Sequence, residues 1–370
     1  MPRPASLRAR LLVAGLATAV TAGIAWPVWR ALSKPRSTVT VIPDPGAVEE
    51  ATWGEQQSYV VDPIVGMRPR RETTFKQPMA ALDGSDVRET VKRRDSRGFL
   101  REQDLPNPLD RPAVLVVGDS HVDGVVDTAD NLTSLLERGS EAGQHPCYCL
   151  NVGCGYYSLW QHVLRLCDLM PQYHPKVVVV VVFLGNDFLD LDNPTVPHLD
   201  GDLRELPGGE RTSPETTSAR MADLAIPEPY GQAFWQGLNQ ALLLHRSPEL
   251  LAVWQKKSAH AIAKLERTAK EHGCAVVWAL LPSLDLVLPA VAQGLGKLAD
   301  EVVRSGANRT VRDMFVAELA AANARVVDLE PPFAAYGKLD LYAIDFHVYR
   351  SGHRIAAATL APVLAELLSR

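Results

Sequence analysis

Short apolar runs alternate with longer segments of mixed polarity along the C-terminal two thirds of the chain. Apolar runs of this kind, bounded by Gly, Pro or polar residues, predict buried strands. The segments between them are long enough for helices that pack on a sheet. The predicted strands are residues 112–117, 147–152, 176–184, 275–281 and 325–329. The predicted helices are residues 131–138, 159–170, 248–272, 310–323 and 352–368.

This alternation predicts an α/β fold with a doubly wound, parallel five-stranded sheet of the flavodoxin-like kind. The predicted domain covers residues 112–370 and carries an insertion at about residues 188–247. Within the insertion, residues 199–203 predict a hairpin turn and residues 207–219 a polar loop. Residues 37–111 mix Pro, Gly and charged residues, which predicts a linker followed by an irregular extension.

The N-terminal segment, residues 1–36, combines basic residues with one uncharged stretch. Leu11 to Trp29 is nineteen residues long, a length that suits a membrane-spanning helix, although its Ala, Gly and Thr content makes insertion marginal. Cleavage of a signal peptide after Ala25 is the alternative, and a buried helix is a third. We expect a membrane-anchored protein with its body outside the cytoplasm, or a secreted protein if the segment is cleaved.

Charge argues against one class of partner. The chain carries a net charge of −5, although its first 36 residues contain six basic residues and no acidic one. The rest of the chain is therefore more acidic than the whole. An acidic body argues against nucleic acid as a partner.

Five cysteines are too few for a disulfide scaffold. Cys147 and Cys149 alternate on a predicted strand, where cysteine often serves as a small apolar residue. One disulfide that involves Cys154, Cys167 or Cys274 stays open. The spacing of Cys147, Cys149 and Cys154 matches no standard zinc pattern, so we expect neither a metal nor a cofactor.

Polar residues that suit acyl chemistry follow three predicted strands and precede the last helix. Gly118-Asp119-Ser120 follows the first strand, Asn151 to Gly155 begins at the end of the second, and Gly185-Asn186-Asp187 follows the third. Asp345-Phe346-His347 lies just before the last helix. The carboxyl ends of strands in an open parallel sheet share one edge, where ligands bind. We therefore expect these residues to form one site.

Ser120 is the predicted nucleophile, because a serine on a tight turn after a strand exposes its hydroxyl. A serine hydroxyl is a poor nucleophile at neutral pH and needs a neighbouring base. Imidazole suits that task, and His347 is the predicted base. Asp345 would accept the other ring proton of His347 and fix its tautomer.

An attacked carbonyl becomes an oxyanion, which needs donors already in place. The backbone N–H groups of Ser120 and Gly155 and the side-chain amide of Asn186 would supply three donors. Gly153 is the alternative to Gly155.

Other interpretations of these residues remain open. Ser120 would otherwise be a turn or N-cap residue, and Asn186 would cap the end of its strand. His353 would replace His347 as the base, whereas His121 fits a wall of the cleft better than a catalyst. The acidic residues that we expect to be solvated rather than to bind calcium are Asp187, Asp190 and Asp192.

The four blocks, in this order, resemble the SGNH (GDSL-type) hydrolase superfamily over about residues 112–370. The resemblance implies that Ser120 matches the nucleophile, Asn186 the oxyanion-hole amide, and Asp345 with His347 the rest of the triad. The glycine block is one residue shorter than in the superfamily, and one residue separates Asp345 from His347 where many members have two. Residues 59–101 resemble the extension that precedes this domain in exported bacterial members.

These observations lead us to expect a serine esterase that removes a small acyl group, such as acetate, from a glycan or another cell-envelope molecule. An O-acyltransferase with the same triad is the alternative, because both pass through an acyl-serine. A glycan-binding module without activity is a further alternative. The aromatic residues of the insertion that would stack on a sugar ring, or pack within a helix, are Tyr230, Phe234 and Trp235.

Overall fold

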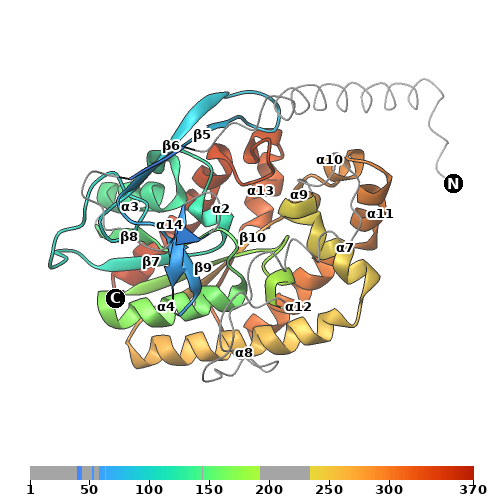
Figure 1. Ribbon diagram of the computed structural model, residues 1–370. Helices are drawn as coiled ribbons and strands as arrows, with labels where there is room; N and C mark the ends of the chain where they lie inside the picture. The colour runs from blue at the N-terminus through green and yellow to red at the C-terminus, as the bar shows by residue number, and fades with distance from the viewer. Residues whose placement is uncertain (1–39, 44–51, 54–57, 63, 144, 192–233) are drawn as a thin grey trace.

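The computed structural model describes residues 40–43, 52–53, 58–62, 64–143, 145–191 and 234–370 (Figure 1). The expected membrane segment 11–29, the hairpin turn 199–203 and the polar loop 207–219 lie outside the described residues. No helix within the described part of the chain is long and apolar enough to cross a membrane.

A five-stranded sheet forms the centre of the protein, and all its neighbouring strands are parallel. Its strands are β7 (Ala113–Val117), β8 (Tyr148–Asn151), β9 (Val177–Phe183), β10 (Ala275–Leu281) and β11 (Val326–Asp328). Their order across the sheet is β11-β10-β9-β7-β8, the doubly wound order 2-1-3-4-5 of flavodoxin-like folds. The predicted fold class and all five predicted strands are confirmed.

Helices cover both faces of this sheet (Figure 1). One face packs against α4 (Leu159–Tyr173), α8 (Leu250–Glu271) and α12 (Ala307–Ala321). The other packs against α3 (Leu132–Ala142), α13 (Glu330–Tyr336) and α14 (Arg350–Leu368). Every residue of β7 and β9 is buried because both of their faces are covered, which explains why these strands are continuous apolar runs in the sequence.

Three short helices between β10 and α12 escaped the sequence analysis: α9 (Leu284–Val287), α10 (Pro289–Gly294) and α11 (Lys297–Ser305). Each is shorter than ten residues, and Pro289 and Gly296 divide the segment, so no sustained helical period appears. The remaining helical segments are α2 (Ser120–Asp123), η1 (Thr128–Asp130), η2 (Leu189–Leu191), the π-helix η3 (Phe234–Leu238), α7 (Asn239–Arg246) and η4 (Leu339–Leu341).

The expectation of an irregular extension before residue 112 was wrong, because strands form much of it. One three-stranded sheet consists of β1 (Thr40–Pro43), β5 (Thr73–Met79) and β6 (Arg88–Arg94). A second consists of β2 (Thr52–Trp53), β3 (Tyr59–Asp62) and β4 (Gly66–Pro69). All their pairings are antiparallel.

Strand β6 shows why the sequence hid these sheets. Its buried residues are Thr90, Lys92 and Arg94, which alternate with exposed or half-buried neighbours. The inward face is thus polar, so the alternation of apolar and polar residues that marks a half-buried strand is absent.

Candidate active site

Ser120 is the first residue of the one-turn helix α2, directly after β7 and the Gly118-Asp119 turn. Gly118 is confined, because a Cβ there would lie 2.3 Å from Cγ2 of Val122. Asp119 is the N-cap, and its Oδ1 accepts a hydrogen bond from the His121 N–H at 2.9 Å. Since Asp119 caps the helix, Ser120 does not, and its half-buried hydroxyl is available for other contacts.

The hydroxyl of Ser120 meets the imidazole of His347. The Ser120 Oγ lies 2.8 Å from Nε2 of His347, and Nδ1 of the same ring lies 3.0 Å from Oδ2 of Asp345. Ser120 and His347 are 227 residues apart in the chain. The structure therefore brings the predicted nucleophile, base and orienting carboxylate together, with contacts of 2.8 and 3.0 Å between them.

A tight turn compensates for the short Asp345-Phe346-His347 block. Phe346 has a φ of +67°, a conformation that residues with a Cβ seldom adopt, and the Ala343 N–H donates to the His347 carbonyl at 2.7 Å. The turn lets Asp345 accept the His347 N–H through Oδ1 at 3.3 Å while Oδ2 faces the ring. One intervening residue is thus enough to place the carboxylate beside the imidazole.

His347 and Asp345 each stabilise the ionised form of the other. Burial lowers the pKa of His347, but the charge and hydrogen bond of Asp345 and the charge of Asp119 together outweigh burial and raise this pKa above its ordinary value of 6.5. Burial likewise raises the pKa of Asp345, but the charge of His347 and the hydrogen bonds to the carboxylate together outweigh burial, so that this pKa is lowered overall. The pair favours an imidazolium beside a carboxylate, which is the state that a base reaches after it takes a proton.

Asn186 lies at the same site, one residue after Gly185 at the end of β9. Its side chain interacts with the carboxylate of Asp119, the residue next to Ser120, and lowers the pKa of that carboxyl. Burial is the larger influence and raises the pKa of Asp119 to about 6. An amide nitrogen carries two hydrogens that it can donate to a ligand.

The structure favours Gly155 over Gly153 as the backbone donor. The Gly153 N–H already donates to Oδ1 of Asn151 at 3.0 Å. Among the described residues, none accepts a hydrogen bond from the Gly155 N–H. Gly155 also allows a close approach, since a Cβ there would lie 2.4 Å from the Tyr59 hydroxyl.

Neither of the other two histidines near the site contacts the Ser120 hydroxyl. His353 is buried, and its Nδ1 accepts the Leu132 N–H at 3.2 Å, at the start of α3. Burial lowers the pKa of His353 to about 4. The ring of His121 stacks on Phe183 at 3.6 Å and accepts the Val348 N–H, and burial holds its pKa well below 6.5. His121 is thus a neutral support whose ring centre lies 4.9 Å from that of His347.

The structure gives no support to the metal and disulfide alternatives. Asp187 is buried and accepts the Phe183 N–H at 2.8 Å, which contradicts the expected solvated position. The side chain of Asp190 and all of Asp192 lie outside the described residues. No His, Cys, Asp or Glu cluster in the described ranges is arranged to hold a metal ion. All five cysteines are free thiols, and Cys147 and Cys149 are buried on β8 as expected.

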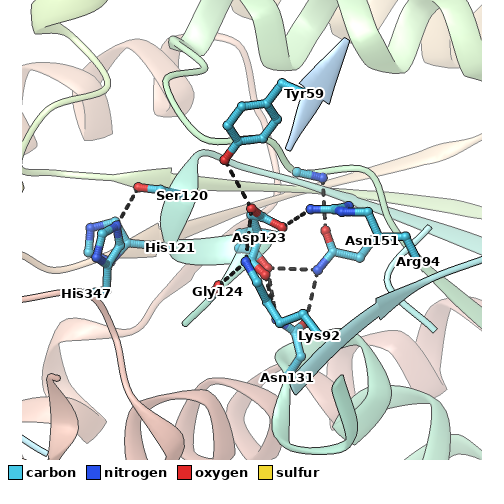
Figure 2. Close-up of polar contacts among 12 residues, drawn as sticks. Tyr59, Lys92, Arg94, Ser120, His121, Asp123, Gly124, Asn131, Asn151 and His347 are labelled. Carbon is cyan, nitrogen blue, oxygen red and sulfur yellow. Dashed lines mark hydrogen bonds and ion pairs between the residues drawn. The ribbon is translucent and has the colours of Figure 1, made fainter. Parts of the chain in front are cut away.

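The sequence analysis missed three residues of the extension that reach the site from behind: Tyr59 on β3 and Lys92 and Arg94 on β6. All three contact Asp123, the last residue of α2 (Figure 2). The sequence holds one sign of them, because Lys92 and Arg94 are two positions apart. Residues with this spacing share one face of a strand, but the strand has to be recognised first. Of the expected aromatic residues, Tyr230 and the side chains of Phe234 and Trp235 lie outside the described part.

No family model matches the chain, and no curated protein matches it. It is similar to the solved structure of TesA, with 14% identity over 69% of this chain and 99% of that chain, and a TM-score of 0.36. The psychrotrophic esterase EstA from Pseudoalteromonas sp. gives 11% identity over 70% and 99%, with a TM-score of 0.38. The lipase/acylhydrolase from Enterococcus faecalis gives 14% over 69% and 96%, with a TM-score of 0.40. At these TM-scores the likeness does not decide the function.

Proposed function

We propose that the protein is a serine esterase of the SGNH type that hydrolyses a small acyl ester through an acyl-serine intermediate. The observation that carries this proposal is the continuous contact from Ser120 through His347 to Asp345. Ser120 and Asn186 follow β7 and β9, the neighbouring strands at which the strand order reverses. This switch point is where open α/β sheets bind ligands.

The chemistry follows from the positions of these atoms. The Ser120 Oγ attacks the ester carbonyl carbon, and Nε2 of His347 takes its proton as the C–O bond forms. The tetrahedral intermediate collapses when its bond to the alcohol oxygen breaks, and His347 returns the proton to that oxygen. Water then attacks the acyl-serine, again with His347 as base, and releases the acid and free Ser120.

The carbonyl oxygen carries the negative charge of both tetrahedral intermediates. In this proposal it is bound by the N–H groups of Ser120 and Gly155 and by the side-chain amide of Asn186. Donors fixed before the reaction stabilise a developing charge without reorganisation, which is usually a large contribution to catalysis.

Loss of the Asn186 amide is expected to lower kcat by about 10²–10³-fold and to leave KM nearly unchanged. The reason is that the amide meets full negative charge only in the transition state. Steady-state kinetics of Asn186→Ala with p-nitrophenyl acetate measure this. A rise in KM alone would make Asn186 a substrate-binding residue instead.

The pH dependence reports on His347. Only the neutral imidazole accepts the Ser120 proton, so kcat/KM should rise with pH through a midpoint above 6.5, in the direction of the raised pKa. Asp345→Asn removes the charge that raises this pKa, and its midpoint should fall below that of the wild-type protein. A pH–rate profile of both proteins is the measurement, and an Asn variant with an unshifted midpoint would exclude this role of Asp345.

The proposed substrate is an O-acetyl or other short acyl ester on a polar carrier such as a glycan. The support comes from the sequence of the insertion, whose first half carries Asp, Asn, Arg, Glu and Thr and little apolar surface for an acyl chain. A chain-length series of p-nitrophenyl esters tests this, with acetate expected to exceed octanoate in kcat/KM. Preference for octanoate would indicate a lipase or thioesterase.

Adding sugar acceptors to the same assay separates hydrolysis from transfer, because an acyltransferase would convert the sugar to its acyl ester faster than it releases acid. A protein inactive on all of these esters would instead support the binding-module alternative.

The proposed location is a membrane surface, with residues 11–29 as the anchor. Fractionation should place the full-length protein in the membrane pellet, whereas a mature N-terminus at Trp26 would show cleavage.

A further inference from the structure

Three buried charged side chains meet at the end of α2 that lies opposite the candidate nucleophile. Lys92 and Arg94 on β6 and Asp123 on α2 are 5%, 5% and 4% exposed. The Asp123 carboxylate accepts from Arg94 through Oδ1 and from the Lys92 Nζ through Oδ2 at 3.3 Å. Figure 2 shows them at one end of α2, with Ser120 and His347 at the other.

This cluster contains two cations and one anion. Within the described residues, Asp123 is the only carboxylate that pairs with either cation. A buried charge is costly unless it is paired, so a net positive charge in such a place calls for an explanation. Lys92 also lies beside an aromatic ring, since its Nζ is 4.6 Å from the ring centre of Phe75.

Lys92 also holds the backbone at the end of α2. Its Nζ donates to the Gly124 carbonyl at 2.7 Å. The Val122 carbonyl accepts from the side-chain amides of Asn131 at 3.0 Å and Asn151 at 2.8 Å. A helix of four residues is not stable alone, so these contacts fix the turn that carries Ser120.

The same network reaches the glycine segment that supplies the proposed backbone donor. Oδ1 of Asn151 accepts the Gly153 N–H, and the Tyr59 hydroxyl, which lies against Gly155, contacts Oδ2 of Asp123 at 3.4 Å. The extension therefore joins the end of α2 to the segment after β8. The two proposed backbone donors, Ser120 N–H and Gly155 N–H, belong to these two segments.

The positive charge also acts on the site. Gly124 is four residues beyond Ser120, about 6 Å along a helix axis. Burial is the main influence that lowers the pKa of His347, and the charge of Lys92 lowers it further, against the charges of Asp345 and Asp119, which raise it.

Other titratable groups also surround Lys92 and His347. The groups that face Lys92 are Asp123, Arg94 and the Cys154 thiol. His121 also faces His347.

We propose that Lys92 is a positioning residue of the active site, a role that rests on the esterase function proposed above. Its ammonium fixes the end of α2 through Asp123 and Gly124, and it supplies the positive charge that favours the oxyanion over the neutral ester. In this arrangement the extension before the catalytic domain is part of the catalytic apparatus. Because Lys92 never touches substrate, it changes the rate and not the affinity.

The test compares Lys92→Met, which removes the charge and the donor, with Lys92→Gln, which removes the charge and keeps a donor. Asp123 keeps Arg94 as its partner in both variants. We expect kcat for p-nitrophenyl acetate to fall about tenfold or more in the Met variant and less in the Gln variant, with KM unchanged. This loss is smaller than that of a direct oxyanion donor. Lys76→Met on β5, where the lysine side chain is 40% exposed, is the matched control and should match the wild-type protein.

An NMR titration of the His347 ring needs no substrate and reports the charge directly. The pKa of His347 should rise in both Lys92 variants, because the repulsion from the ammonium is lost. A folded Lys92→Met protein with wild-type kcat, or with an unshifted His347 pKa, would overturn the role of Lys92 and leave the esterase proposal intact. Wild-type protein without esterase activity would overturn the esterase proposal, and with it the catalytic role of Lys92, whatever the titration shows.

Discussion

Ser120→Ala is expected to lower kcat for p-nitrophenyl acetate by about 10⁴–10⁶-fold, to the level left by the oxyanion donors and substrate binding alone. The hydroxyl is the only group of the site that can form the acyl intermediate, so its loss removes the covalent route. In the wild-type protein Nε2 of His347 lies 2.8 Å from the Ser120 Oγ, and in the alanine variant it has no serine proton to accept.

The fold should survive this change. Asp119 and not Ser120 caps α2, so the alanine variant keeps the N-cap hydrogen bond and should unfold at nearly the wild-type temperature. Ser369→Ala, at the exposed end of α14, is the matched control and should keep full activity. Undiminished turnover by the Ser120 variant would exclude the serine mechanism.

His347→Ala is expected to cost about as much as the loss of Ser120, because the serine hydroxyl is inert without its base. The double variant should therefore be scarcely slower than either single one, since residues that act as a unit are not additive. Steady-state kinetics of the three variants provide the comparison.

His353→Ala is the matched control for this experiment. His353 accepts the Leu132 N–H and lies away from the Ser120 hydroxyl, so its loss should reduce stability by about 1–3 kcal/mol while kcat stays within a few-fold of wild type. Thermal unfolding separates the two effects. An inactive His353 variant beside an active His347 variant would show that the base has been misassigned.

The central sheet could be predicted from the sequence because its strands are buried on both faces. Every residue of β9, from Val177 to Phe183, is buried, and a continuous apolar run of this length has few other interpretations. The candidate site followed from the sheet, since Ser120 and Asn186 come directly after strands whose carboxyl ends share one edge.

Other features needed coordinates, because they depend on contacts between distant segments. The choice between Gly153 and Gly155 depends on Asn151, whose side chain accepts one of the two N–H groups. The choice between His347 and His353 depends on which ring reaches Ser120 across 227 residues. A sequence pattern gives neither distance.

The extension was misjudged for a different physical reason. Strand detection relies on apolar residues at alternate positions, and the inward face of β6 carries Lys92 and Arg94 instead. Both side chains pair with Asp123, which follows Ser120 by only three residues but is 29 residues from Arg94. The polar inward face of β6 thus packs against α2, the helix that begins with Ser120.

Covalent labelling with a serine-directed phosphonate, followed by peptide mass spectrometry, is the decisive measurement of the Ser120 assignment. We expect one label per chain, on the peptide that contains Ser120, no label in Ser120→Ala, and much slower labelling in His347→Ala. A label on a different serine, or equal labelling of the Ser120→Ala protein, would contradict the assignment of Ser120 as an activated nucleophile.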